Sequence, residues 1–298
     1  MNLFEFIGVH DKLTIQLVYT INFNETRSIM DSSYTLIKGT VPLLISMPHN
    51  GQQIPDDIAL TMTEFAKSVV DTDWYKDRLY DFAQSLGAYI IIPKYSRYVI
   101  DLNRDPHGID LYPDENSTEL CPLSGFDLSP IYLAGQQPNG VEISRRIKDY
   151  WQPYHQAIND TLDEIKTEFG QAVLLDAHSI LSHVPRFFDG QLPDFNFGTS
   201  SGKSCSVSLV NNLENIVYAP YSMVIDGRFK GGFITRHFGN PGNNIHAIQL
   251  ELSQRTYMNE LTTEYNLSLA EQVQQKLRTM VICLIDFAIE HKRDKHGE

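Results

Sequence analysis

The sequence predicts an α/β fold of three layers, in which helices cover both faces of a central sheet. Four short, continuous apolar runs have the pattern of strands that are buried on both faces. Segments with helical periodicity alternate with these runs, and this alternation is typical of a layered α/β architecture. Ligands bind to such sheets beyond the carboxyl ends of the strands, so the residues after each run are the first candidates for a functional site.

Polar residues suited to metal or carboxylate chemistry follow all four runs. The runs and their polar neighbours are residues 41–47 with His49, residues 89–93 with residues 97–104, residues 172–175 with Asp176 and His178, and residues 245–250 with Glu251. Four distant segments could therefore deliver two histidines, several acids and several arginines to one edge of the sheet. Such a set is typical of a metal-dependent hydrolase that acts on a small acidic substrate.

Helices are expected between and after the strands. Periodicity predicts them over residues 68–87, 141–169 and 261–291. Gly170 is suited to cap the second of these helices, and Pro153 predicts that this helix is kinked or divided in two.

The remaining segments are expected to be irregular or peripheral. Residues 102–140 and 190–215 are rich in polar and turn-forming residues, and we expect loops there. Residues 1–35 are expected to form a peripheral extension of short strands. Residues 36–298 would then form a single large α/β domain.

Composition narrows the class of partner. The formal net charge of −13 argues against nucleic acid, because phosphate binding requires a basic surface. No apolar stretch is long enough to span a bilayer, and the N-terminus lacks the basic region of a secretory signal. The three cysteines match no metal spacing and are expected to be reduced thiols. We therefore expect a cytoplasmic enzyme with a small-molecule substrate, and the sequence leaves open whether it is a homo-oligomer.

Two histidines and an aspartate are the candidate metal ligands. His49 and His178 each follow a predicted strand, where a neutral imidazole is a good ligand. Catalytic zinc commonly takes three protein ligands, and Asp71 and Asp73 precede a predicted helix. One of them would cap the helix and the other would bind; Asp73 is the preferred ligand. Asp176 shares a strand face with His178 and could orient it or bind the metal itself.

Glu251 is the candidate general base. Leu250 and Leu252 flank it, so its carboxylate should be partly desolvated and its pKa raised. Such a group can take a proton from water and return it to the leaving amine. Strand alternation alone also allows an outward-facing glutamate, and Asp176 is the next candidate base.

Cationic residues for an acidic substrate form two clusters. Arg97, Asn103 and Arg104 follow the second predicted strand, whereas Arg228 and Arg236 surround glycine turns. Arginine binds carboxylates through two parallel hydrogen bonds, and asparagine can hold a carboxylate oxygen. Two clusters would suit a substrate with two carboxylates, and they must overcome the negative charge of the chain.

These segments resemble the N-formylglutamate amidohydrolase (formylglutamate deformylase) family, which is similar to the zinc-carboxypeptidase-like hydrolases. The resembling segments are residues 44–51, 71–74, 78–80, 97–104, 174–179, 227–237 and 249–255. They occur in order over roughly residues 36–290, and together they are far more specific than any one alone.

The resemblance implies a phosphorylase/hydrolase-like fold with a central mixed sheet and a divalent metal, with zinc expected. It also implies hydrolysis of N-formyl-L-glutamate to L-glutamate and formate, a step of histidine degradation. Asn103 and Arg104 have the form of the superfamily pair that binds a substrate carboxylate, and an arginine would also stabilise the oxyanion. Glu251 matches the general-base glutamate. The superfamily has a ligand glutamate three positions after the first histidine, but Gln52 stands there, so the third ligand moves to Asp73.

Two alternatives remain at the level of sequence. One is an amidohydrolase of another N-acyl acidic amino acid, because the motifs do not define the acyl group. The other is a metal-free homologue that binds an acidic amino acid without cleaving it. Elemental analysis and a test of formate release would separate these functions.

Overall fold

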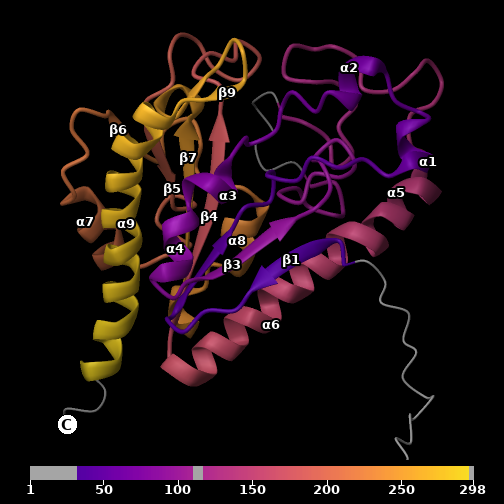
Figure 1. Ribbon diagram of the computed structural model, residues 1–298. Coiled ribbons are helices and arrows are strands. Elements are labelled where there is room, and N and C mark those ends of the chain that lie inside the picture. The colour runs from indigo at the N-terminus through magenta and orange to yellow at the C-terminus, as the bar shows by residue number, and fades with distance from the viewer. Residues whose placement is uncertain (1–31, 110–116, 295–298) are drawn as a thin grey trace, which may run out of the picture. The chain divides into compact units, whose positions relative to one another are not determined.

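Among the described residues, a mixed sheet of seven strands lies between two layers of helices (Figure 1). The computed structural model describes residues 32–109 and 117–294. The strands are β1 (Tyr34–Ile37), β2 (Leu43–Ser46), β3 (Tyr89–Pro93), β4 (Ala172–Ile180), β5 (Phe195–Gly198), β6 (Met223–Ile225) and β7 (Ile245–Ser253). Their order is β1-β3-β2-β4-β7-β5-β6. The four strands β3, β2, β4 and β7 are parallel, whereas β1 and β5 run antiparallel to their neighbours β3 and β7.

Helices cover both faces of this sheet, so the predicted three-layer architecture is confirmed. The helices are α1 (Asp56–Ala59), α2 (Glu64–Lys67), α3 (Lys76–Leu79), α4 (Asp81–Ser85), α5 (Gly140–Arg146), α6 (Gln152–Phe169), α7 (Val207–Glu214), α8 (Phe233–Phe238) and α9 (Leu267–Asp294). A π-helical turn, η1 (Ile147–Trp151), joins α5 to α6, and two 3-10 turns are η2 (Pro241–Asn243) and η3 (Gln254–Thr256). A small hairpin of β8 (Met258–Asn259) and β9 (Glu264–Tyr265) precedes α9.

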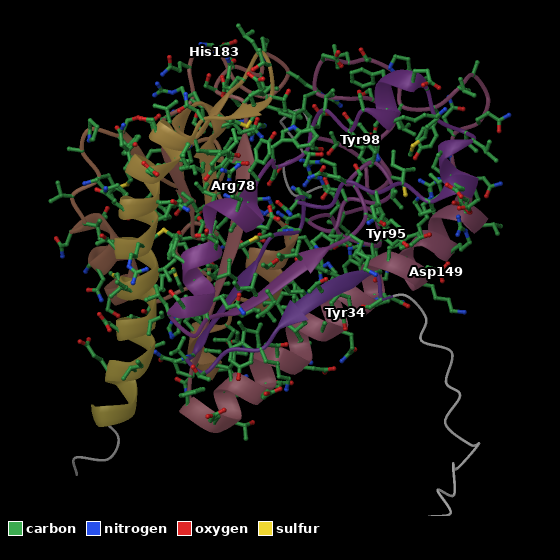
Figure 2. All side chains as sticks on the ribbon, in the orientation of Figure 1. Tyr34, Arg78, Tyr95, Tyr98, Asp149 and His183 are labelled. Atoms are coloured by element: carbon green, nitrogen blue, oxygen red, sulfur yellow. The ribbon has the colours of Figure 1, made fainter. Side chains whose placement is uncertain are left out.

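In the part of the chain that the structure describes, each face of the sheet carries one large hydrophobic core. Helices α4, α7 and α9 supply one core, and α6 and α8 supply the other. Side chains fill the space between the sheet and both helical layers (Figure 2). None of the helices in residues 32–109 and 117–294 is long and apolar enough to cross a membrane.

The alternation of β4 explains where polar residues can gather. Val173 and Leu175 pack into the core under α9, whereas Leu174 packs into the core under α6. Asp176 and His178 lie on the same face as Leu174, as predicted, because side chains alternate along a strand. The face toward α6 and α8 therefore changes from apolar to polar at the carboxyl end of β4.

Strand β7 repeats this change beside β4. The two strands are parallel, and their register places His178 opposite Glu251. Ala247 belongs to the core under α6, and Gln249 and Glu251 follow it on the same face. The parallel register thus brings the polar ends of two strands together, as the sequence predicted.

Three predicted boundaries are wrong because tertiary contacts or caps were not recognised. Residues 68–75 do not belong to the helix expected over residues 68–87; only α3 and α4 are helical there. The loop expected over residues 190–215 contains β5 and α7, and α7 is capped by Ser206, whose Oγ accepts from Leu209 N. The last helix begins at Leu267 because the preceding residues form the β8–β9 hairpin.

Other sequence-based predictions of the fold hold. Gly170 ends α6 with φ of 83°, and the long helix before it is divided by the π turn just ahead of Pro153. Residues 102–109 and 117–139 contain no regular helix or strand. The extension expected over residues 1–35 lies outside the described residues except at its end, where Tyr34 begins β1.

Candidate metal centre and active site

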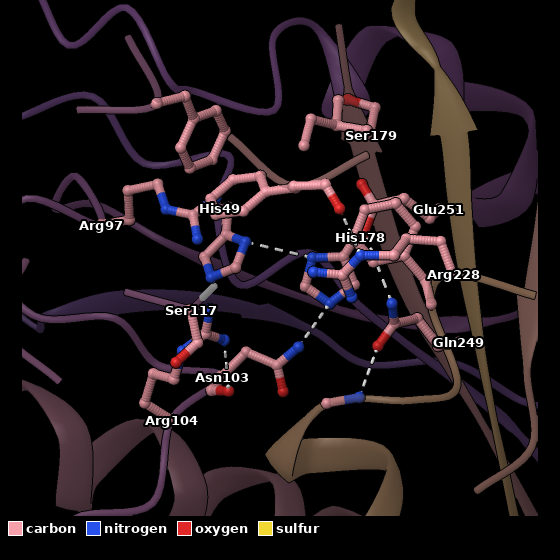
Figure 3. Close-up of a pocket in the computed structure, with 15 residues that line it drawn as sticks. His49, Arg97, Asn103, Arg104, Ser117, His178, Ser179, Arg228, Gln249 and Glu251 are labelled. Carbon is pink, nitrogen blue, oxygen red and sulfur yellow. Dashed lines mark hydrogen bonds between the residues drawn. The ribbon is translucent and has the colours of Figure 1, made fainter. Parts of the chain in front are cut away.

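Two histidines and one aspartate converge at the carboxyl ends of β2 and β4, and Figure 3 shows the two histidines, His49 and His178. The Nδ1 atoms of His49 and His178 are 3.1 Å apart. Asp73 Oδ2 lies 3.7 Å from His49 Nδ1 and 3.3 Å from His178 Nδ1. All three side chains are buried. The structure thus brings together the three residues that the sequence proposed as ligands.

Each imidazole contacts a carboxylate on the side that faces away from the shared centre. His49 Nε2 lies 2.7 Å from Asp101 Oδ1, and His178 Nε2 lies 3.0 Å from Asp176 Oδ2. In the neutral tautomer that metal binding requires, a proton on each Nε2 would make these hydrogen bonds and would leave each Nδ1 lone pair directed at the shared centre. The strand-end aspartate Asp176 therefore orients a histidine, which is one of the two roles considered for it.

The surroundings of the two histidines set different proton affinities. Burial and then the nearby Arg97 lower the pKa of His49. Burial also lowers the pKa of His178, but the effects of Asp176 and Asp73 outweigh burial and raise this pKa to about 10. The carboxylates around His178 thus hold a positive charge at the centre. A divalent cation would compete for that place, and its binding would release a proton.

The two aspartates of the 71–73 turn point to different partners. Asp73 Oδ2 faces the histidines and accepts the Ser179 N–H at 3.0 Å. Asp71 Oδ2 instead accepts from Tyr98 Oη at 2.6 Å and from Phe126 N at 2.8 Å. Asp71 is thus engaged in holding loops together rather than facing the histidine pair.

The donor set fits a divalent cation. Tetrahedral ligands that are about 2.0 Å from zinc are separated from one another by about 3.3 Å. The three distances among the ligand atoms of His49, Asp73 and His178, which run from 3.1 to 3.7 Å, are close to this separation. Two imidazoles and one carboxylate also match the ligand types of catalytic zinc.

Glu251 faces the same pocket from β7. Its side chain is buried, with 8% of its surface exposed, which decides against the outward-facing orientation. Burial and then Asp73 raise the pKa of Glu251, and although His178, Arg97 and Lys76 lower it, the result is about 7. A carboxylate with this pKa can both accept and donate a proton near neutral pH.

A pocket that is partly open to solvent lies over His49, His178 and Glu251. Arg97, Asn103, Arg104 and Arg228 all line it (Figure 3). Arg236 is not among its lining residues, and its Nε donates to Gly231 O at 2.7 Å. The structure therefore brings four of the five proposed substrate-binding residues to one cavity.

Side chains of the first cationic cluster also form hydrogen bonds with other residues of the protein. Arg97 Nη2 donates to Asp101 Oδ2 at 2.7 Å, and its guanidinium lies over the Phe126 ring. Arg104 donates through Nε to Thr118 O at 3.0 Å. Asn103 Oδ1 accepts from the N–H of a residue of α8, at 2.8 Å. These contacts fix where each polar group faces the pocket.

Comparison with known proteins identifies the family of the chain. The family model of N-formylglutamate amidohydrolase matches residues 41–258. The chain belongs to the N-formylglutamate amidohydrolase family. It is therefore a hydrolase of amide C–N bonds.

Known relatives align with this chain over nearly their full length. N-formylglutamate deformylase of Pseudomonas aeruginosa is 46% identical over 264 residues, which are 88% of this chain and 99% of that protein. N-formylglutamate deformylase of Pseudomonas putida is 44% identical, over 88% of this chain and 98% of that protein. The crystal structure of N-formylglutamate amidohydrolase from Ralstonia eutropha JMP134 superposes with a TM-score of 0.73 at 25% identity, covering 89% of this chain and 99% of that one.

Several residues of this family member's site were not found by sequence reasoning. The sequence singles out Asp101 only as part of residues 97–104, yet the structure shows that it contacts both His49 and Arg97. Lys76 is fully buried and donates to His178 O at 2.8 Å. Gln249 lines the pocket, and its amide lies 3.4 Å from Glu251 Oε2. A signal for Gln249 existed, because it shares the strand face of Glu251.

Proposed function

We propose that this chain hydrolyses N-formyl-L-glutamate to L-glutamate and formate with the help of a divalent cation. We expect this cation to be zinc. The observation that supports this most directly is the buried group of His49, Asp73 and His178 beside Glu251, in a pocket lined by arginines. Membership of the amidohydrolase family and the names of the Pseudomonas relatives favour the same substrate.

His49, Asp73 and His178 would hold the cation. A bound divalent cation supplies Lewis acidity, which lowers the pKa of water and polarises a carbonyl group. Asp101 and Asp176 would keep the two imidazoles in the tautomer and orientation that binding needs, because each accepts from an Nε2.

Glu251 would carry the proton of the reaction. As a carboxylate it takes a proton from the attacking water, and as a carboxylic acid it gives that proton to the departing amine nitrogen. One group can do both near neutral pH because its pKa is about 7. Gln249 would hold Glu251 in place through its amide.

The arginines would recognise the two carboxylates of the substrate. Arg104 with Asn103 would bind one carboxylate, and Arg228 would bind the other, while Arg97 and Arg104 would also stabilise negative charge on the formyl oxygen. Arg228 supports this role better than Arg236 because it lines the pocket. These local cations are needed because the chain has a net charge of −13.

We place this reaction in the degradation of histidine, in the cytoplasm. The first assignment is supported by the substrate named for the relatives. The second is supported by the cysteines, since Cys121, Cys205 and Cys283 are all free thiols.

The experiment is a measurement of formate release from a panel of N-formyl and N-acetyl amino acids by the metal-loaded protein. We expect N-formyl-L-glutamate to be the best substrate and a chelator to abolish the reaction until zinc is restored. Equal rates for N-acetyl-L-glutamate would assign a broader N-acyl specificity. Full activity in protein shown to be free of metal would contradict the metal-dependent mechanism.

A further inference from the structure

The π turn η1 and the start of α6 contact the backbone of the segment that carries Asn103 and Arg104. Trp151 Nε1 donates to Arg104 O at 3.0 Å. His155 Nε2 lies 2.8 Å from Leu102 O, and it must donate because a carbonyl oxygen only accepts. Two ring N–H groups from one helix therefore hold the carbonyl oxygens on either side of Asn103.

The two rings are packed as a single rigid unit. Trp151 and His155 stack with ring centroids 3.6 Å apart and planes inclined by 14°. Phe233, the first residue of α8, lies 5.5 Å from each of them. Both rings are buried, with 9% and 5% of their surface exposed. Their positions are thus set by packing, so they can fix the backbone that they contact.

The π turn aligns a third donor with this pair. Arg146 Nη1 donates to Val99 O at 2.9 Å, earlier in the same segment. Arg146 and Trp151 are five residues apart, which in a regular α-helix would place them about 140° apart around the axis. In a π turn, residues five apart are joined by a hydrogen bond and lie on the same side. The extra residue of η1 therefore directs Arg146 and Trp151 at one segment.

Asn103 itself contacts α8 and His178. Its backbone O and its Oδ1 accept from the first two N–H groups of α8, at Phe233 and Ile234. Its Nδ2 lies 3.0 Å from His178 Nε2. A Cβ built on Gly232 would lie 2.2 Å from that Nδ2, so the amide has no room to move toward α8.

We propose that Trp151 and His155 are positioning residues that set the place of Asn103 and Arg104 in the pocket, and through them the affinity for the acidic substrate. The inference rests on the proposed function for the identity of the substrate. Trp151 and His155 are not among the residues that line the pocket, and they act only through the backbone that they hold.

The test compares Trp151→Phe and His155→Phe with Tyr154→Phe in the full-length, metal-loaded protein. Each of the first two removes one ring N–H but keeps an aromatic ring in the stack. Tyr154→Phe is the matched control, because it removes a buried hydrogen bond from the same helix, in this case to Ser46 Oγ at 3.0 Å. His155→Gln keeps an N–H donor and should restore part of the function.

We expect KM for N-formyl-L-glutamate to rise about tenfold in Trp151→Phe and His155→Phe, which corresponds to about 1.4 kcal/mol. The dissociation constant of L-glutamate, measured by calorimetry, should rise in parallel, and metal content should stay constant. Any fall in kcat through the oxyanion contact of Arg104 should be smaller than the rise in KM. Tyr154→Phe should lose comparable stability toward urea but keep its KM.

Hydrogen exchange tests the same placement without a substrate. Exchange in peptides that cover residues 101–104 should accelerate in Trp151→Phe and not in Tyr154→Phe. Unchanged exchange, or a KM that rises equally in the control, would overturn the positioning role. Absence of formate release by the wild-type protein would instead overturn the proposed function, and the exchange result would still decide the inference.

Discussion

The metal centre and the cationic wall of the pocket are built in different ways. In the centre, His49 lies 2.7 Å from one carboxylate and His178 lies 3.0 Å from another, and all four side chains are buried. In the wall, Arg104 and Arg228 donate to backbone carbonyls of loops, Arg104 to Thr118 O and Arg228 to Phe187 O. The centre is therefore held by charges on regular strands and adjoining turns, whereas the wall depends on how loops pack.

This difference predicts separate effects of mutation. Loss of a charge in the centre leaves its partner buried without compensation, which is costly and should appear in metal binding. Loss of Arg104 or Arg228 from the wall leaves a backbone carbonyl without a donor but removes no metal ligand, so it should appear in substrate affinity. The following mutations test whether the two regions can be separated in this way.

Removing a ligand should have the largest effect. In His178→Ala and His49→Ala, we expect metal affinity to fall by more than the 10–100-fold typical for loss of a supporting partner, so metal content by elemental analysis should fall sharply. Activity should fall with it. His246→Ala is the control, because His246 is equally buried but accepts from Ser206 N, outside the site. Full metal content in both ligand variants would refute the site.

Glu251→Gln should remove catalysis and leave binding intact. The amide keeps the size of the side chain but cannot take a proton, so kcat should fall roughly 10²–10⁴-fold while metal content is unchanged. The pKa of Glu251 is raised to about 7, so the wild-type group is protonated and inactive as a base below that pH. The rate should therefore decline as pH falls below about 7, and this acidic limb should be absent in the variant. A near-normal kcat would make Asp176 the next candidate base.

Asp101→Asn should weaken the centre without removing a ligand. It deprives His49 of the carboxylate that accepts from Nε2, and we expect metal affinity to fall about 10–100-fold in a chelator competition assay. Asp71→Asn provides the comparison, since Asp71 bonds Tyr98 and Phe126 and should leave metal affinity nearly unchanged. A larger loss in Asp71→Asn would move the third ligand from Asp73 to Asp71.

Arg104→Ala should affect substrate affinity and not metal content. We expect KM to rise by about 30-fold, which corresponds to about 2 kcal/mol, the lower end for a desolvated charge pair, because 23% of the Arg104 side chain is exposed. Arg228→Ala should also raise KM, and Arg236→Ala should raise it least because Arg236 does not line the pocket. An unchanged KM in Arg104→Ala would place it outside the substrate site.

The strands of the sheet could be predicted from sequence more reliably than the turns. Residues 172–175 and 245–250 lie in β4 and β7 because buried parallel strands are continuously apolar, and this signal is local. The turn before α3 could not be predicted, because the Asp73 N–H bonds His49 O and the Lys76 N–H bonds Asn50 Oδ1. These contacts join segments that are distant in sequence, and they override helical periodicity.

The sequence by itself determined the layered architecture, the family, and the strand-end residues His49, His178 and Glu251. It could do so because strand periodicity and the order of motifs are properties of the chain alone. Only the tertiary structure decided that Asp73 rather than Asp71 faces the histidines, and that Asp101 belongs to the centre. The physical reason is that the direction of a side chain in a turn is set by partners that come from other segments.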